Sequence, residues 1–323
     1  MSENKNQLDA VTMGETMMAF EAQDYGPLRE VHHFKKWIGG AEDNFAIGLS
    51  RLGFHCGWIS RLGSDEFGKE IKRTIKGEGI DVSHVVFDPD APTGVFIVER
   101  QAAGDFRCFY YRHASAASRL SPDDIDSEFI GKARMLYLTG ITPAISPSAA
   151  AAVDKVFSIA KKNKQPIVFD PNLRLKLCSI DRAREILVPL MQESSYVLPG
   201  EEELKHLMDC KDIESAIAKA HRMNIHHLII KKGKLGADIA FSGGLQMHVP
   251  AFVVTRPISS MGAGDCFAAG FVAGLLKDIS IEESVRWGNA MGAFCMMGWG
   301  PYQTLPDMQE LNSFLAGSEM IAR

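Results

Sequence analysis

Ser259-Ser260-Met261-Gly262-Ala263-Gly264-Asp265-Cys266-Phe267-Ala268-Ala269-Gly270 is the stretch around which this chain is organised. An apolar, β-rich run at 247–254 precedes it, and bulky apolar residues recur on one side of the segment from Asp265 to Leu276. This pattern predicts a strand, a turn of small residues and a helix. Small residues let the backbone approach a ligand, and the free N–H groups of a helix N-terminus attract anions, phosphate above all. The turn is therefore a candidate anion site.

The carboxylate of Asp265 lies in the same turn, where it would repel a bound phosphate. The placement makes sense if Asp265 takes a proton from a hydroxyl group while the N–H groups hold the phosphoryl group that this hydroxyl attacks. The alternative is a simple helix cap, because Asp is a favoured N-cap residue. The local chemistry leaves both interpretations open.

The composition indicates a globular protein with a large core. The chain has 323 residues, 46% hydrophobic and 23% charged, which is enough for one large α/β unit or two domains. A net charge of −5 does not suggest a nucleic-acid or anionic-membrane binder. The start of the chain is polar, no apolar run could span a bilayer, and the six cysteines form no Cys-x-x-Cys pair. We therefore expect a cytoplasmic protein with reduced thiols and neither a zinc site nor a disulfide framework.

Strand and helix signals alternate through the second half of the chain. The predicted strands are 135–139, 166–169, 196–198 and 227–231, and the predicted helices are 148–162, 181–192, 201–208, 213–223, 281–297 and 307–315. Such alternation predicts right-handed crossovers and a mostly parallel sheet that is covered on both faces. Ligands bind at the carboxyl ends of such strands, and Arg174 and Glu203 follow two of them.

The first half of the chain carries more strand signals. The segment 8–20 begins as a strand at 8–13 and continues into Gly14-Glu15-Thr16, and the other predicted strands are 31–38, 56–62, 94–99 and 106–112. Gly104-Asp105 predicts a hairpin turn between the last two. Gly39-Gly40 leads into a second predicted helix that has Asn44 in its first turns, which indicates either a ligand site or tight helix packing. The segment 63–70 matches a phosphate-binding P-loop except at Glu70, where a Ser or Thr should bind Mg²⁺. We reject the P-loop because this metal ligand is of the wrong type.

Gly-Ala-Gly-Asp at 262–265, opening a small-residue helix late in the chain, resembles the signature of the ribokinase-like (PfkB) carbohydrate kinases. The resemblance runs in family order from Gly14-Glu15 to Leu305-Pro306. It implies an α/β fold of three layers, α/β/α, with a mostly parallel central sheet and a small β-sheet lid. It also implies a single kinase domain over 1–323, with lid segments at about 15–38 and 93–113 that close over a sugar and could pair into a homodimer.

The resemblance also implies a role for each site residue. Asp265 would be the general base, and the amides of Gly262, Ala263 and Gly264 would form the anion hole. The residues implied for the substrate are Gly39, Gly40, Asn44, Phe96, Tyr110, Arg112, Ile141, Arg174 and Asp265. Those implied for ATP are Lys232, Gly233, Gly236, Gly262 and Gly264, and Glu203 would act on Mg²⁺ through water. By themselves, residues 232–236 could be an ordinary turn, and 201–203 an acidic helix start that the helix dipole favours.

Within the family, three segments most resemble the 2-keto-3-deoxygluconate kinases. They are Tyr-Tyr-Arg-x-x-Ser-Ala at 110–116, Gly-Ile-Thr-Pro-Ala at 140–144 and Asp-Pro-Asn-x-Arg at 170–174. Arg112 and Arg174 suit an acid sugar, because a planar guanidinium pairs with a carboxylate. The implied reaction is the ATP-dependent phosphorylation of 2-keto-3-deoxygluconate to its 6-phosphate.

Four residues depart from the family pattern. Ser259-Ser260 replaces an Asp-Thr that helps to bind a monovalent cation, so we expect little dependence on K⁺. Phe96 stands in place of a substrate-side Tyr, and Pro301 in place of an acidic residue that contacts the sugar. These departures keep two other hypotheses open, a kinase for a different sugar and a sugar-binding regulator with weakened turnover. A Rossmann dehydrogenase is set aside, because Gly262-x-Gly264-x-x-Phe267 lacks the third glycine.

Overall fold

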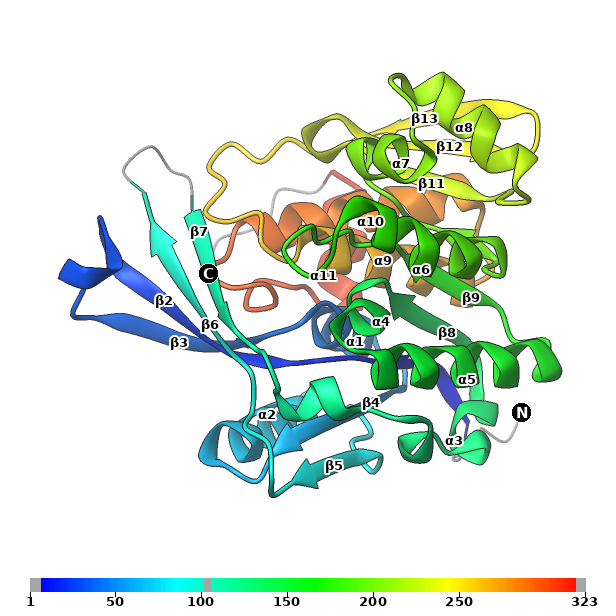
Figure 1. The fold of residues 1–323 in the computed structure, drawn as a ribbon. Coiled ribbons are helices and arrows are strands. Elements are labelled where there is room, and N and C mark those ends of the chain that lie inside the picture. The colour runs from blue at the N-terminus through cyan, green and yellow to red at the C-terminus, as the bar shows by residue number, and fades with distance from the viewer. Residues whose placement is uncertain (1–6, 102–105, 318–323) are drawn as a thin grey trace.

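A nine-stranded sheet forms the centre of the molecule in the computed structural model, which describes residues 7–101 and 106–317 (Figure 1). Its strand order is β13-β12-β11-β10-β9-β8-β1-β4-β5. The strands are β1 (Leu8–Met13), β4 (Cys56–Gly63), β5 (Val85–Asp88), β8 (Ala133–Thr139), β9 (Ile167–Asp170), β10 (Tyr196–Val197), β11 (Leu228–Lys231), β12 (Gly236–Phe241) and β13 (Gly244–Pro250). Among the described strands of this sheet, the pairs β11–β12 and β12–β13 are antiparallel and the others are parallel, which confirms the prediction of a mostly parallel sheet.

Helices cover both faces of this sheet, as Figure 1 shows. One buried cluster lies under α1 (Ala41–Arg51), α2 (Glu66–Gly77), α9 (Ala263–Leu276), α10 (Ile281–Met296) and α11 (Met308–Leu315). A second lies under α3 (Ser127–Gly131), α5 (Pro147–Asn163), α6 (Ile180–Gln192), α7 (Glu201–Met208) and α8 (Ile213–Arg222), and the short α4 (Ile141–Ile145) precedes α5. None of the helices in the described ranges combines the length and apolar character that crossing a membrane requires.

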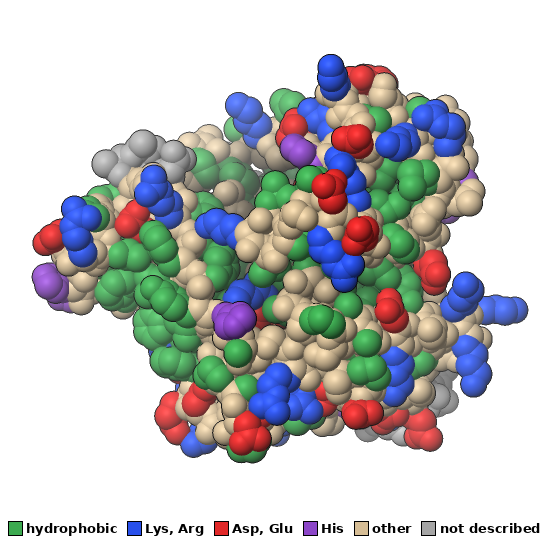
Figure 2. All heavy atoms as spheres, viewed as in Figure 1, with side chains coloured by type: hydrophobic (Ala, Val, Ile, Leu, Met, Phe, Trp, Pro, Cys, Tyr) green, Lys and Arg blue, Asp and Glu red, His purple; other side chains and the backbone are tan. Residues whose placement is uncertain are grey.

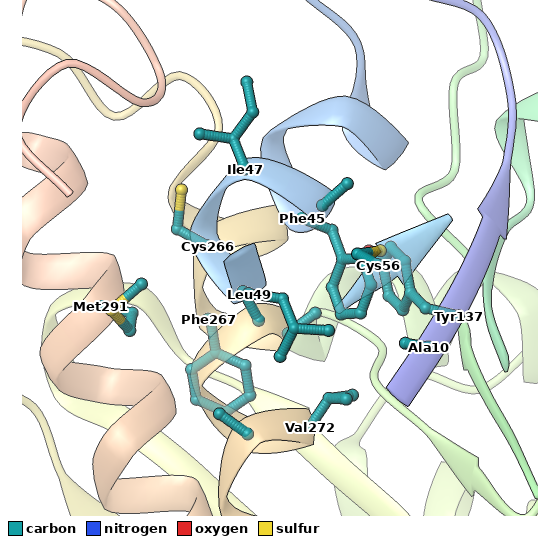
Figure 3. Packing of buried hydrophobic residues seen from close by; sticks show 14 of the residues in the cluster. Ala10, Phe45, Ile47, Leu49, Cys56, Tyr137, Cys266, Phe267, Val272 and Met291 are labelled. Atoms are coloured by element: carbon teal, nitrogen blue, oxygen red, sulfur yellow. The ribbon is translucent and has the colours of Figure 1, made fainter. Parts of the chain in front are cut away.

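Helix α9 is buried along nearly its whole length, which explains its small residues. A Cβ atom on Gly270 would lie 2.6 Å from the Trp287 carbonyl oxygen, and one on Gly274 would lie 2.5 Å from Ser284 Oγ, so α10 packs directly on the α9 backbone. Toward α1, a Cβ atom on Gly48 would lie 2.9 Å from Ala269 Cβ, and Phe45 and Leu49 of α1 share a buried cluster with Phe267 and Val272 of α9 (Figure 3). This packing fixes the N-terminal turn of α9, which carries Asp265.

A smaller sheet of four strands, here called the lid sheet, projects from the main body (Figure 1). Its order is β3-β2-β6-β7, built from β2 (Met17–Tyr25), β3 (Phe34–Gly39), β6 (Val95–Arg100) and β7 (Phe106–Tyr111). Its own apolar cluster contains Met17, Ala19, Trp37, Phe96 and Val98. Hydrophobic side chains also gather on its visible surface (Figure 2). On β7, the side chains of Phe106, Phe109 and Tyr111 are exposed. Pairing of two lids into a homodimer stays a prediction.

Several predicted boundaries differ from the structure. The strand predicted at 31–38 begins only at Phe34, after a 3-10 helix at 28–30 and a short connection. The strand predicted at 247–254 ends at Pro250, and the apolar residues beyond it leave the sheet. Strands β5 and β12 were not predicted, since short segments without strict alternation give a weak signal. The predicted hairpin turn at Gly104-Asp105 lies outside the described residues.

The rejected P-loop is a structural turn into α2. The Asp65 carboxylate accepts a hydrogen bond from Gly68 N at 2.8 Å and so caps the helix. A Cβ atom on Gly68 would lie 2.2 Å from the Gly63 carbonyl oxygen. Glycine is thus required there by the fold, without any phosphate.

Candidate active site

A cavity of about 1710 Å³ lies between the lid sheet and the carboxyl ends of the central strands. The predicted site residues that line it are Gly39, Gly40, Asn44, Phe96, Tyr110, Arg112, Ile141, Arg174, Glu203, Gly262, Gly264 and Asp265. These residues come from segments far apart in the chain, so the fold brings the predicted sugar, base and anion-hole residues together. Four other predicted residues, Ala263, Lys232, Gly233 and Gly236, are not part of the cavity lining.

Asp265 is held between two side-chain amides. Asn44 Nδ2 donates to Oδ2 at 2.9 Å, and Asn172 Nδ2 donates to Oδ1 at 3.2 Å. Only 7% of the residue is exposed, and this burial raises its pKa to about 7, against the opposing effects of the Asn44 hydrogen bond and the Arg174 and Lys231 charges. A carboxylate with a pKa near neutrality, fixed in place and open to a cavity, suits a general base.

The first turn of α9 has the backbone geometry of an anion hole. Gly262 has a φ of +82°, and a Cβ atom there would lie 2.5 Å from Pro301 Cβ, so only glycine fits. No hydrogen bond between described residues takes up the N–H groups of Gly264 or Asp265, whereas Ala263 N donates to the Ser260 carbonyl at 3.2 Å. The geometry therefore offers the amide of Gly264 to a ligand and leaves that of Ala263 engaged.

Three polar residues of this site were not predicted from the sequence. The buried Asp170 at the end of β9 pairs with Lys231 Nζ at 2.5 Å through Oδ2 and accepts from Asn172 N at 3.1 Å through Oδ1. Asn172 has a φ of +42°, and it is the residue that donates to Asp265. Asp170 thus holds Lys231 and Asn172 in position near the base. The signal was present, since Asp170 and Asn172 stand at the carboxyl end of a predicted strand, where polar residues mark the ligand crevice.

The two predicted carboxylate-binding arginines have different surroundings. Arg112 is only 9% exposed and forms an ion pair with the Glu15 carboxylate, which also accepts from Ser115 Oγ at 2.5 Å. Arg174 lines the cavity and forms no ion pair with any residue in the described part of the chain. The positive charge of Arg174 is therefore available to a ligand, while that of Arg112 is largely offset.

Two further acids are buried at the start of α1, beside the base. Glu42 Oε1 accepts from Thr139 Oγ1 at 2.6 Å and from Thr142 Oγ1 at 3.0 Å, and Asp43 Oδ1 accepts from Thr16 Oγ1 at 2.8 Å. Burial raises the pKa of Glu42 to about 7 and that of Asp43 well above its usual range. Neither residue is part of the cavity lining, so these carboxyl groups belong to the packing at the start of α1.

The predicted nucleotide residues form a tight turn between β11 and β12. Lys232 Nζ pairs with Asp238 at 3.0 Å and with Glu201 at 3.3 Å. Gly236 has a φ of +110°, and a Cβ atom there would lie 2.1 Å from the Val249 carbonyl oxygen. The fold alone accounts for this glycine, and the role of the turn in binding ATP stays a prediction.

Both carboxylate oxygens of Glu203 accept hydrogen bonds from backbone N–H groups. Oε1 accepts from Leu173 N at 2.9 Å and Oε2 from Gly200 N at 2.7 Å, beside the cavity. Within the described ranges, no three His, Cys, Asp or Glu side chains are grouped to hold a metal ion. A Mg²⁺ ion carried by a nucleotide keeps several waters, so Glu203 fits contact through water better than direct ligation.

Comparison with known proteins identifies the family. The family model of the pfkB carbohydrate kinases matches residues 7–308. The chain belongs to this family. A 2-dehydro-3-deoxygluconokinase from Bacillus subtilis (strain 168) is 36% identical over 317 residues, covering 97% of each chain. A 5-dehydro-2-deoxygluconokinase from Geobacillus kaustophilus (strain HTA426) is 30% identical over 315 residues, covering 95% of this chain and 93% of that one.

A solved structure supports the same assignment. A fructokinase from Vibrio cholerae O395, in a form bound to fructose, ADP and calcium ion, superimposes with a TM-score of 0.83 at 25% identity and covers 95% of this chain and 99% of that one. The predicted ribokinase-like fold with a lid sheet is confirmed, and the protein is a carbohydrate kinase.

Proposed function

We propose that this carbohydrate kinase transfers the terminal phosphoryl group of ATP to the 6-hydroxyl group of 2-keto-3-deoxygluconate. The observation that carries the proposal is Arg174, a guanidinium with no ion-pair partner in the described chain, in the cavity that also holds Asp265. A sugar carboxylate would offset this charge in bidentate fashion, whereas a neutral sugar would not. The name of the Bacillus subtilis relative agrees with such a substrate.

The residues present suit in-line transfer. Asp265 takes the proton of the sugar hydroxyl while that oxygen forms its bond to the terminal phosphorus, and the bond between this phosphorus and the oxygen of the departing ADP breaks. Asn44 and Asn172 keep the carboxylate in position. The N–H group of Gly264 and the Lys231 ammonium, which lies 3.3 Å from where a Gly264 Cβ would be, stabilise the charge on the transferred group. Mg²⁺, when bound with the nucleotide, would offset phosphate charge near Glu203.

Arg112 acts mainly on the shape of the sugar pocket. Its charge is offset by Glu15, and its guanidinium lies 5.9 Å from the centre of the Tyr110 ring, which stacks on Phe96 at 5.6 Å. Replacing Arg112 would leave the buried Glu15 carboxylate without its ion-pair partner, so a loss of stability accompanies any loss of binding. Arg174 is therefore the sharper test of carboxylate recognition.

The test is a coupled ADP-release assay with 2-keto-3-deoxygluconate, 5-keto-2-deoxygluconate, ribose and fructose. We expect turnover on the first sugar. Arg174→Ala should raise the KM of this sugar by about 10- to 100-fold, because that factor corresponds to the free energy of a hydrogen bond to a charged group. The KM of a neutral sugar should change little. Arg29→Ala removes an exposed positive charge away from the cavity and serves as control. Equal losses on acidic and neutral sugars would contradict carboxylate recognition.

A second candidate substrate is the isomeric acid sugar 5-keto-2-deoxygluconate. Phe96 and Pro301 remove two polar contacts that the resemblance implies for the first sugar, and Pro301 lines the cavity. The Geobacillus kaustophilus relative carries the corresponding name. Higher kcat/KM for this isomer in the same assay would favour it, and Arg174 would keep its role.

A further inference from the structure

The loop at 298–303 contacts both the lid sheet and the anion hole. The ring of Trp299 lies 3.8 Å from the Arg100 guanidinium at the end of β6, and Lys35 of β3 lies 5.8 Å from the same ring. Two residues further on, Pro301 fills the space beside Gly262, and its carbonyl accepts a hydrogen bond from Cys266 Sγ at 3.2 Å. One short loop thus joins the lid sheet to the first turn of α9.

A second contact joins the same two parts. The side chain of Met261, directly before Gly262, packs against the apolar cluster of the lid sheet. Its carbonyl accepts a hydrogen bond from Cys295 Sγ at 3.2 Å, which ties this residue to α10. The segment that shapes the anion hole is therefore packed on the lid.

Arg100 is itself rigidly placed. Glu21 Oε1 accepts from Arg100 Nε at 3.0 Å and from Nη2 at 2.6 Å, and Glu21 Oε2 accepts from Trp37 Nε1 at 3.0 Å. Trp37 lines the sugar side of the cavity and packs edge-on against Phe96 at 5.3 Å. A continuous set of contacts therefore leads from the sugar pocket through Arg100 to Trp299.

We propose that Trp299 is a positioning residue for phosphoryl transfer, whose stack on Arg100 couples the closed lid to the geometry of the anion hole. This inference rests on the proposed transfer from ATP to a sugar, whichever sugar that is. When the lid moves away, Trp299 loses its cation and Met261 loses its apolar surroundings, so the segments on both sides of Gly262 lose their supports together. The Gly264 amide is then best placed for the phosphoryl group only when the lid covers the sugar, which limits hydrolysis of ATP by water.

The first test compares Trp299→Ala with Trp299→Phe. A stack of a cation on a partly exposed ring is worth about 1 kcal/mol, so we expect Trp299→Ala to lower kcat roughly fivefold, with the KM for ATP near that of the parent. Trp299 is 43% exposed, so its loss leaves no buried cavity. Trp299→Phe keeps a ring under Arg100 and should restore most of kcat. Lys277→Ala removes a cation from the ring of Phe54, at 5.6 Å and away from both sites, and should leave kcat unchanged.

The second test does not depend on turnover. Hydrogen exchange of the β2 and β3 amides, measured on the protein without ligands, should be faster in Trp299→Ala and near the parent rate in Trp299→Phe. Unchanged kcat and exchange in Trp299→Ala would overturn the proposal, as would a lower kcat that comes only with a lower Tm and unchanged exchange. If the parent phosphorylates no sugar in the panel, the proposed function fails, while the exchange rates still decide whether Trp299 holds the lid.

Discussion

Helices α1 and α9 both start after glycines at the floor of the same cavity, and their first turns meet where Asn44 donates to Asp265. In α1 the first turn is filled by its own buried acids, Glu42 and Asp43, which accept from threonine hydroxyls. In α9 the Gly264 amide faces the cavity and forms no hydrogen bond with the described residues. Since α9 also carries a carboxylate in its first turn, Asp265, a glycine before a helix indicates an anion site only where an amide of that turn is left open to the cavity.

The largest expected effect is a difference in kcat between variants of an α9 acid, Asp265, and an α1 acid, Asp43. Asp265→Asn should keep the fold and lower kcat roughly 10²- to 10⁴-fold, because a positioned base is lost. Asp43→Asn, which changes a buried acid of α1, should cost far less in turnover. Steady-state assays with circular dichroism as the folding check compare the two variants. Turnover of Asp265→Asn within threefold of the parent would remove the assignment of the base.

The pH dependence of stability tests whether Glu42 fills the α1 turn as a structural acid. In the folded protein, burial raises the pKa of Glu42 from 4.5 to about 7, so folding favours the protonated form of this residue. Its contribution to the unfolding free energy is therefore complete below pH 4.5 and is lost as the pH rises through 7. Glu42→Gln should flatten the fall in unfolding free energy over this range by up to about 3 kcal/mol. Urea unfolding of the parent and of Glu42→Gln from pH 4.5 to 8 measures the unfolding free energy at each pH. If the two plots of free energy against pH run parallel, the prediction is wrong.

Glycine substitutions compare packing with ligand binding. A Cβ atom on Gly40 would lie 2.1 Å from the Glu15 carbonyl oxygen, so Gly40→Ala should destabilise the fold by about 1–3 kcal/mol, as overpacking does. On Gly264 the nearest atom would be Nζ at the end of the Lys231 side chain, at 3.3 Å, which is a much milder contact. Gly264→Ala should therefore unfold near the parent's urea midpoint but show a lower kcat. A large stability loss in Gly264→Ala alone would reverse the comparison.

Local chemistry was enough to predict the α9 turn, since Gly262, Gly264 and Asp265 combine helix geometry and charge within one segment. The alternating strands and helices could also be predicted, because each element shows its own hydrophobic pattern within one segment. Local chemistry could not predict that Glu15 offsets Arg112, because that pair depends on how β1 and the lid sheet meet. Nor could it predict that the Ala263 amide is engaged by Ser260, which is a detail of turn geometry. Contacts between distant segments decide which candidate charges are left for a ligand.

The smallest expected effect concerns Ser259, just before the α9 turn. Its Oγ accepts from Met261 N at 3.2 Å, and a serine hydroxyl brings no charge to a cation. The nearby Met296 carbonyl already accepts from Ile258 N at 2.8 Å and from Ser259 N at 3.4 Å. Hard cations favour charged oxygen ligands, so we expect the activity of the parent to depend little on K⁺.

Installing the carboxylate should create or strengthen that dependence if neighbouring carbonyls have suitable spacing. The measurement is kcat against K⁺ concentration, with choline to hold the ionic strength, for the parent, Ser259→Asp and Ser259→Asn. Asn matches Asp in size without its charge, so only Ser259→Asp should respond to K⁺. The fold and Asp265 stay the same in all three proteins, which confines any difference to the cation. Strong K⁺ activation of the parent would show that oxygens other than a carboxylate at position 259 bind the cation near the α9 turn.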